Sequence, residues 1–294
     1  MGEFSRKFSD EHIGKDSPCG FYFASNEYNI KDPVAWISAH SKGKPLYLMG
    51  IIGGGDTALS YVSALQPQRA FFFDISDKAV SYLGLRLSLM KDAKNVSEYL
   101  LDMLCVRPEH RNDFFNVSGD AALRQRIRSY TSDYVGIAMQ GLGFMKGHGF
   151  DTSDVNSEVF YDPNFRKRAA VECVRYMQHI QENGEKEHSW IDTNNYESLR
   201  RSVQENRIKA FRSDYFGGFK TSAQTLIQLY DIRNLVVYLS NFTDICQRAP
   251  TKDQQFDNCQ KVKAVLDPLS ELVDKMWVID SRKVDGTNRI VYGK

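Results

Sequence analysis

The sequence predicts an α/β protein with a doubly wound, mainly parallel sheet, and three observations support this prediction. Short apolar segments of strand length alternate with longer segments of helical periodicity. A glycine-rich turn follows the first apolar segment, and an acidic residue ends the second. Strands that alternate with helices in this way build a parallel sheet with helices on both faces.

The segment 45–74 shows this pattern most clearly. An apolar run at 46–52 is followed by three glycines, a helical pattern at 57–65, and a second apolar run that ends on Asp74. Glycines adopt positive φ and let the backbone approach a ligand closely. The helix that starts behind them offers free N–H groups and the positive end of its dipole. This arrangement is typical of a nucleotide-type cofactor site at the carboxyl edge of a parallel sheet.

The glycine turn also matches a known spacing. Gly53-x-Gly55-x-x-Ala58 fits the dinucleotide fingerprint, and Asp74 follows at about the expected 20 residues. A strand before the turn, a helix after it and an acid at the end of the second strand make the site Rossmann-like. The alternative is a strand–helix–strand unit whose glycines only shape a turn.

The remaining elements follow from apolar runs and helical spacing. We expect strands at 46–52, 69–74, 208–212, 235–239, 276–280 and 289–292. The dipeptide Asp285-Gly286 predicts an antiparallel hairpin between the last two strands. Ser76 is the expected N-cap of the helix after the second strand. A further helix over 254–274 is expected to be interrupted near Asp267-Pro268.

Three parts of the chain are distinguished by composition. Residues 1–44 form a polar N-terminal extension of helix and loop, and residues 45–294 form the Rossmann-like domain. Within that domain, residues 91–200 show helical rather than strand patterns and are interpreted as a helical insertion. Such insertions commonly carry substrate contacts or a cover over the site. A glycine-rich loop in it, 141–149, holds His148, the candidate general base.

Composition excludes several classes of function. The net charge of +1 gives no electrostatic argument for binding nucleic acid. Five dispersed cysteines without a CxxC pair indicate reduced thiols and a cytoplasmic location. No apolar run approaches 18 residues and the N-terminus has no apolar signal region, so neither a membrane span nor secretion is expected. The six histidines lack metal-ligand spacing, so no metal is expected. The oligomeric state is not indicated.

This order of elements resembles the class I S-adenosylmethionine-dependent methyltransferases. In that family the first glycine loop lies against the methionine part of the cofactor, and the acid of the second strand holds the ribose. The resemblance therefore implies S-adenosyl-L-methionine as cofactor, with Gly53 and Gly55 at the methionine part and Asp74 at the ribose. It also implies that Asp214, after the third strand, faces the adenine amine. The end of the fourth strand, Ser240-Asn241, would border the reacting centre.

A second resemblance is to the transferases of betaine-lipid synthesis, which move the 3-amino-3-carboxypropyl group of the same cofactor to diacylglycerol. It covers Tyr28 to Met90, with Tyr28-Asn29, Asp32-Pro33, Gly54-Gly55-Asp56-Thr57-Ala58-Leu59 and Tyr82-Leu83-x-Leu85-Arg86-Leu87 as its motifs. Those transferases usually continue Leu-Asn-Pro after the ribose acid, whereas this chain continues Ile75-Ser76-Asp77. The group transferred, methyl or aminocarboxypropyl, and the acceptor, a small molecule or a lipid, therefore stay open.

Two other readings use the same residues. A nicotinamide- or flavin-dependent oxidoreductase would use the same glycines and acid, and a non-catalytic binding protein would keep a degenerate site. The predicted cofactor-binding residues are Gly53, Gly54, Gly55, Asp56, Asp74, Asp214 and Ser240. The catalytic candidates are Asn241 and His148. For Asp56, helix capping is an equal alternative.

Overall fold

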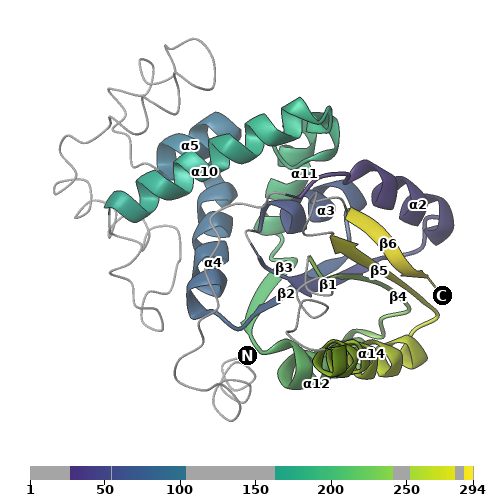
Figure 1. Cartoon of the computed structure of the whole chain (residues 1–294). Helices are drawn as coiled ribbons and strands as arrows, with labels where there is room; N and C mark the ends of the chain where they lie inside the picture. The colour runs from purple at the N-terminus through teal and green to yellow at the C-terminus, as the bar shows by residue number, and fades with distance from the viewer. Residues whose placement is uncertain (1–26, 54, 104–162, 241–251, 282–287, 294) are drawn as a thin grey trace.

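The computed structural model describes residues 27–53, 55–103, 163–240, 252–281 and 288–293. In this part of the chain a six-stranded sheet lies between two layers of helices (Figure 1). Five strands are parallel, and the sixth pairs antiparallel with the fifth. The predicted fold class is thereby confirmed, including the C-terminal antiparallel hairpin.

The strands lie in the order β3-β2-β1-β4-β5-β6. Their bounds are β1 (Tyr47–Ile51), β2 (Arg69–Asp74), β3 (Ile208–Arg212), β4 (Asn234–Tyr238), β5 (Lys275–Ser281) and β6 (Asn288–Gly293). Each predicted strand agrees with the observed one to within one residue at both ends. The predictions succeeded because each strand is a short apolar run bounded by polar or turn residues.

Helices cover both faces of the sheet, as the doubly wound architecture requires (Figure 1). One face carries α2 (Lys31–Ser41), α3 (Asp56–Leu65), α4 (Asp77–Asp92), α5 (Val96–Met103), α10 (Pro163–Glu182) and α11 (Thr193–Gln204). The other carries the π-helical turn η3 (Tyr215–Phe219), α12 (Lys220–Tyr230) and α14 (Lys252–Leu272). A 3-10 turn, η2 (Lys186–His188), precedes α11.

Successive strand residues point into two different cores. Leu48 packs into the core under α3 and α4, while its neighbour Met49 packs into the core under α12 and α14. The same alternation separates Val236 from Val237 on β4. Strands buried on both faces read as continuous apolar runs, which is why the sequence pattern was so clear.

The described helices of the predicted insertion form an outer extension of one helical layer. Helix α11 packs on α3 and α4, and α10 packs on α5. Trp190, just before α11, is fully buried in the same core as strand β1. The described residues between 91 and 200 form helices and no strand. The loop 141–149 lies outside the described residues.

Two local predictions have different outcomes. Ser76 is the N-cap of α4, and its side chain accepts a hydrogen bond from the Ala79 amide, as predicted. The predicted interruption of the last helix is wrong, because α14 continues through Pro268. A proline inside a helix costs about 3 kcal/mol. The buried side chains of Val265 and Leu269 flank it, and each contributes roughly 1.5–3 kcal/mol by burial, which offsets that cost.

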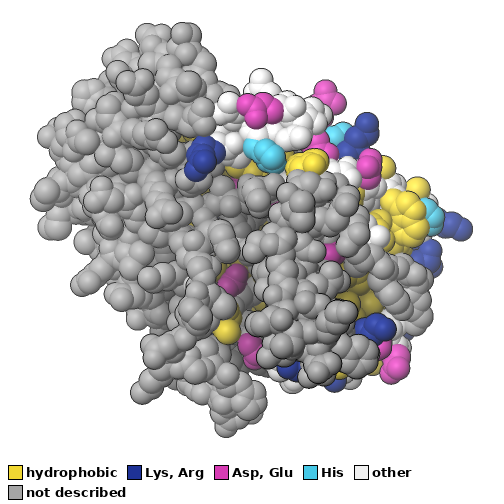
Figure 2. All heavy atoms as spheres, in the orientation of Figure 1, with side chains coloured by type: hydrophobic (Ala, Val, Ile, Leu, Met, Phe, Trp, Pro, Cys, Tyr) yellow, Lys and Arg dark blue, Asp and Glu magenta, His cyan; other side chains and the backbone are white. Residues whose placement is uncertain are grey.

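The surface of the described region shows mixed charge. Figure 2 shows acidic and basic side chains interspersed over the coloured part of this face. This mixture agrees with the net charge of +1. Within the described residues, no helix combines the length and the apolar character needed to cross a membrane.

Candidate functional site

The chain reverses its direction of winding at β1, whose neighbours are β2 on one side and β4 on the other. Ligands of doubly wound folds bind at the carboxyl ends of the strands at such a switch point. In this region the loop after β1 makes a tight turn, in which the Gly55 amide donates to the Ile52 carbonyl at 2.7 Å. Gly53 and Gly55 have φ values of 52° and 81°, which favour glycine. The predicted glycine turn therefore has the backbone conformation that its sequence indicated.

Asp74 ends β2 directly beside this turn. Its carboxylate accepts hydrogen bonds from the Ser76 amide, at 2.9 Å, and from the Gly53 amide. Burial raises the pKa of Asp74, and these backbone amides partly oppose the rise. The side chain is half-buried, so part of the carboxylate faces solvent. The predicted acid, Asp74, therefore contacts the predicted glycine turn directly through the Gly53 amide.

Ser240 lies on the opposite side of the glycine turn. A Cβ atom placed on Gly53 would lie 3.7 Å from the Ser240 Oγ. Ser240 has a positive φ of 54°, and its carbonyl accepts a hydrogen bond from the Ser281 amide at 2.6 Å. The ends of β1, β4 and β5 therefore meet at this point, and Ser240 lies next to Gly53.

Glu27 is a residue of this edge that sequence analysis missed. Its carboxylate accepts hydrogen bonds from the Tyr238 hydroxyl and from the Ser240 Oγ. Thr57, in the first turn of α3, also hydrogen-bonds to it through its side chain. The only local signal was its position directly before Tyr28-Asn29. Two of the three partners, Tyr238 and Ser240, lie more than 200 residues away in sequence.

The electrostatic environment of Glu27 is unusual for a carboxylate. The residue is only 3% exposed. Burial raises the pKa of Glu27 from 4.5 to about 7, the hydroxyls of Ser240 and Tyr238 oppose the rise, and the charge of Asp280 adds to it. Asp280, on β5, is also buried. A strongly shifted carboxyl at a strand edge is typical of functional sites.

The structure places Asp56 elsewhere. The N-cap of α3 is Gly55, so the capping alternative for Asp56 is wrong. Its carboxylate, 1% exposed, forms an ion pair with Arg86 at 2.6 Å and accepts a hydrogen bond from the Trp190 indole at 3.2 Å. This buried pair joins α3 to α4 and to the insertion. We therefore remove Asp56 from the proposed cofactor ligands.

Asp214 caps the π-helical turn η3. Its carboxylate accepts hydrogen bonds from the amides of Gly217, at 2.6 Å, and Gly218, at 3.1 Å. It follows the edge strand β3, and the neighbouring Ser213 amide donates to the Asp74 carbonyl at 2.8 Å. Asp214 thus lies on the β2 side of the site, and its contact with an adenine stays a prediction.

Three predicted site residues, Gly54, Asn241 and His148, lie outside the described residues. Among the residues that are described, no group of three or more His, Cys, Asp or Glu side chains is arranged to hold a metal ion.

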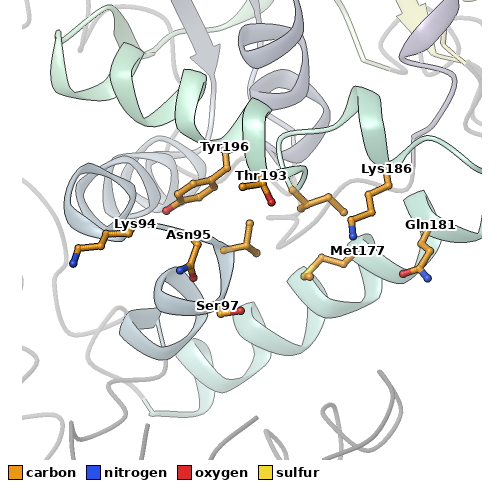
Figure 3. Close-up of a pocket in the computed structure, with 10 residues that line it drawn as sticks. Lys94, Asn95, Ser97, Met177, Gln181, Lys186, Thr193 and Tyr196 are labelled. Atoms are coloured by element: carbon orange, nitrogen blue, oxygen red, sulfur yellow. The ribbon is translucent and has the colours of Figure 1, made fainter. Parts of the chain in front are cut away.

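A separate cavity of about 230 Å³ lies between α5, α10 and α11. Figure 3 shows side chains that line it, among them Met177 of α10, Tyr196 of α11 and Lys186 of η2. Two helices begin at its wall, but their first amides already have side-chain partners. Asn95 accepts from the Glu98 amide, and Asp192 caps α11. This cavity is remote from the strand ends, and we assign it no function.

No family model matches the chain, and a search of curated proteins finds no match. The site is therefore interpreted from its own groups. A backbone turn at positive φ, an acid that is half-buried beside it and a cluster of buried hydroxyls and carboxyls form a continuous edge over β2, β1, β4 and β5. These groups suit a nucleoside whose ribose is bound by the acid and whose polar arm crosses the glycine turn.

Proposed function

We propose that this chain is an S-adenosylmethionine-dependent transferase. The observation that carries the proposal is the pairing of Asp74 with the glycine turn at the switch point of the sheet. Asp74 accepts from the Gly53 amide, and this contact between the acid and the glycine turn supports a ribose-binding role for Asp74. The transferred group, methyl or aminocarboxypropyl, and the acceptor, a small molecule or a lipid, are not decided by this observation.

The charge distribution favours this cofactor over a dinucleotide. The diphosphate of NAD or FAD usually binds at the helix N-terminus behind the glycine loop. Here Thr57, in the first turn of α3, hydrogen-bonds to the buried carboxyl of Glu27, and Asp280 lies nearby. A diphosphate would meet two acidic side chains at that point. A ligand with a positively charged arm would be attracted by them.

The proposed role of the chain is mainly alignment. When bound, S-adenosylmethionine supplies a sulfonium whose attached carbon is already activated for transfer. Asp74 would hold the ribose hydroxyls, and Gly53 would allow the arm to pass close to the backbone. Correct orientation of reacting groups accounts for a large part of the rate in such reactions.

Replacing Asp74 tests the proposal. Hydrogen bonds to a charged group contribute about 1.5–3 kcal/mol, so Asp74→Asn should weaken S-adenosylmethionine binding by roughly 10- to 150-fold. The asparagine oxygen can still accept from the Ser76 amide, so the melting temperature should change little. Isothermal titration calorimetry and melting curves measure the two effects.

Asp274→Asn is the matched control. Asp274 immediately precedes β5 and so lies at the amino ends of the strands, opposite the carboxyl ends that hold Asp74. Its side chain is 60% exposed. This variant should bind the cofactor as the parent protein does. If NAD or FAD stabilises the parent protein while S-adenosylmethionine does not, the oxidoreductase alternative replaces the proposal. If none of these ligands binds, the binding-protein alternative is favoured.

A further inference from the structure

A buried ion pair lies directly behind the glycine turn. Gly55 ends this turn with a φ of 81°, and its amide donates to the Ile52 carbonyl at 2.7 Å. The next residue, Asp56, begins α3 and forms an ion pair with Arg86 of α4 at 2.6 Å. A Cβ atom placed on Gly55 would lie 3.1 Å from the Arg86 Nη1, which is tighter than most contacts of a Cβ atom. The backbone of the turn therefore packs directly against the guanidinium.

Neighbouring elements hold both members of this pair in place. The Arg86 Nε donates to the Tyr99 hydroxyl of α5 at 3.1 Å, and the guanidinium carbon lies 5.3 Å from the centroid of the Trp190 ring. The Trp190 indole donates to the Asp56 carboxylate at 3.2 Å. Both charged side chains are only 1% exposed. At this exposure neither can touch a ligand, so the pair can act on a ligand only through the turn.

A second group of hydrogen bonds fixes the start of α3. The Ser60 Oγ donates to the Asp56 carbonyl at 2.9 Å and accepts from the Trp190 amide at 3.1 Å. The Tyr176 hydroxyl of α10 lies 3.1 Å from the same Oγ. The first turn of α3 follows Gly55 directly in the chain, so a displacement of this helix turn would displace Gly55 as well. Side-chain contacts from α4, α5 and α10 and from Trp190 thus oppose movement of the glycine turn.

We propose that Asp56 and Arg86 are positioning residues of the site, which hold the glycine turn in the conformation that binds the ligand. This inference rests on the proposed function, because it concerns the affinity for an adenosyl ligand. A backbone that is fixed before the ligand arrives loses less conformational freedom on binding, and binding is correspondingly tighter. The pair therefore contributes to affinity in addition to the stability of the fold.

A double variant separates these two contributions. Asp56→Leu combined with Arg86→Met replaces the pair by apolar side chains and leaves no buried charge unpaired, so this protein should fold. Its affinity for S-adenosylmethionine should be about 2- to 30-fold lower than that of the parent, measured by isothermal titration calorimetry. A double variant that folds and binds as tightly as the parent would overturn the inference, and the proposed function would stand.

Hydrogen exchange followed by NMR reports on the turn itself. The Gly55 amide exchanges when the turn opens, whereas the amide of Val237, in the buried strand β4, exchanges through larger unfolding events. In the double variant, exchange of the Gly55 amide should accelerate by a larger factor than exchange of the Val237 amide. Equal acceleration of the two amides would mean that the pair only stabilises the fold, and the inference would be rejected.

Arg86→Lys provides a second variant that keeps a cation beside Asp56. Lysine lacks the planar guanidinium that contacts Tyr99 and the glycine turn, so this variant should fold and also bind S-adenosylmethionine more weakly than the parent. Ile227→Ala is the control, since Ile227 is buried in α12 on the other face of the sheet. This control should lower the melting temperature and leave the affinity unchanged.

The remaining outcomes also have distinct meanings. If Ile227→Ala weakens binding as much as Arg86→Lys does, general destabilisation explains the loss and the inference is rejected. Parental affinity in Arg86→Lys rejects it too. If the parent protein itself does not bind S-adenosylmethionine or its demethylated product, S-adenosylhomocysteine, the proposed function fails, and the inference fails with it.

Discussion

Asp74 and Glu27 are both acids at the carboxyl edge of the sheet, yet their surroundings differ. Asp74 is half-buried and accepts from backbone amides, which stabilise a carboxylate. Glu27 is almost fully buried and faces the charge of Asp280, and both effects disfavour ionisation more than its hydroxyl donors favour it. The first environment suits a charged hydrogen-bond acceptor for ribose. The second favours the protonated form of the acid.

The pKa of Glu27 predicts a dependence of stability on pH. Burial raises this pKa from 4.5 to about 7, so between these pH values the folded protein holds a proton that the unfolded chain has released. The free energy of unfolding therefore falls as pH rises through this window. The shift corresponds to roughly 3 kcal/mol. Glu27→Gln removes this loss, so the variant should gain about that much over the parent between pH 4.5 and pH 8.

Urea denaturation at several pH values measures this difference. Other groups titrate in both proteins, so the informative quantity is the variant minus the parent. The buried titratable groups that interact with Glu27 are Asp280, Tyr61, Tyr176 and Tyr238, and all four are retained in the variant. Exposed Glu187→Gln should show a constant difference across the range. A constant difference for Glu27→Gln would mean that its carboxyl is not held protonated in the folded state.

At the scale of elements, the ion pair of Asp56 with Arg86 connects the helices behind the site. Arg86 also donates to the Tyr99 hydroxyl at 3.1 Å and lies over the Trp190 ring, 5.3 Å from its centroid. Its Nη1 would lie 3.1 Å from a Cβ placed on Gly55. The same guanidinium therefore contacts α3 and two parts of the insertion, α5 and Trp190. It also packs against the glycine turn at Gly55.

Arg86→Met should be strongly destabilising. It leaves the carboxylate of Asp56 buried without its cation, which costs about 3–5 kcal/mol in buried pairs. Arg86→Met combined with Asp56→Leu should cost less than the sum of the single changes, because no charge remains unpaired. Urea denaturation of the three variants gives this coupling energy.

The exposed pair of Arg233 with Asp231, 2.7 Å apart, is the matched control. Arg233→Met should cost less than about 1 kcal/mol, as is usual for surface pairs. A similar loss in Arg86→Met and Arg233→Met would show that burial of the first pair has no energetic consequence.

At the scale of the whole molecule, the sheet and the insertion share one core. Trp190 of the insertion and Trp277 of β5 are both buried in the core on the α3 side of the sheet. The Tyr196 hydroxyl donates to the Ala93 carbonyl at 3.1 Å, which attaches α11 to the end of α4. The described helices of the insertion are therefore part of the domain core rather than a separate unit.

This shared core predicts that α10 and α11 unfold together with the sheet. In a Trp36→Phe background, which removes the half-exposed tryptophan, Trp190→Phe leaves Trp277 as the reporter, and Trp277→Phe leaves Trp190. Within each variant, the urea midpoint from fluorescence should equal the midpoint from far-UV circular dichroism. An earlier fluorescence transition for the variant that retains Trp190 would indicate that the insertion unfolds independently.

Local patterns in the sequence were sufficient for the elements and for part of the site. The strands and the N-cap at Ser76 depend on residues within one segment, so their signals lie next to one another in the chain. The pairing of Asp74 with the glycine turn also follows locally, because both end strands that are adjacent in a strand–helix–strand unit. Pro268 was misread because the local helix-breaking signal is outweighed by packing against the sheet.

The sequence by itself therefore determined the doubly wound fold, the strand bounds, and the glycine turn with its acid. Only the tertiary structure decided which partners the other acids near the glycine turn meet. It paired Asp56 with Arg86, 30 residues away, and brought Glu27 to Tyr238, 211 residues away. The physical reason is that periodicity records which face of an element is buried. The partner that a buried charge meets depends on contacts between segments distant in the chain, and no local pattern contains them.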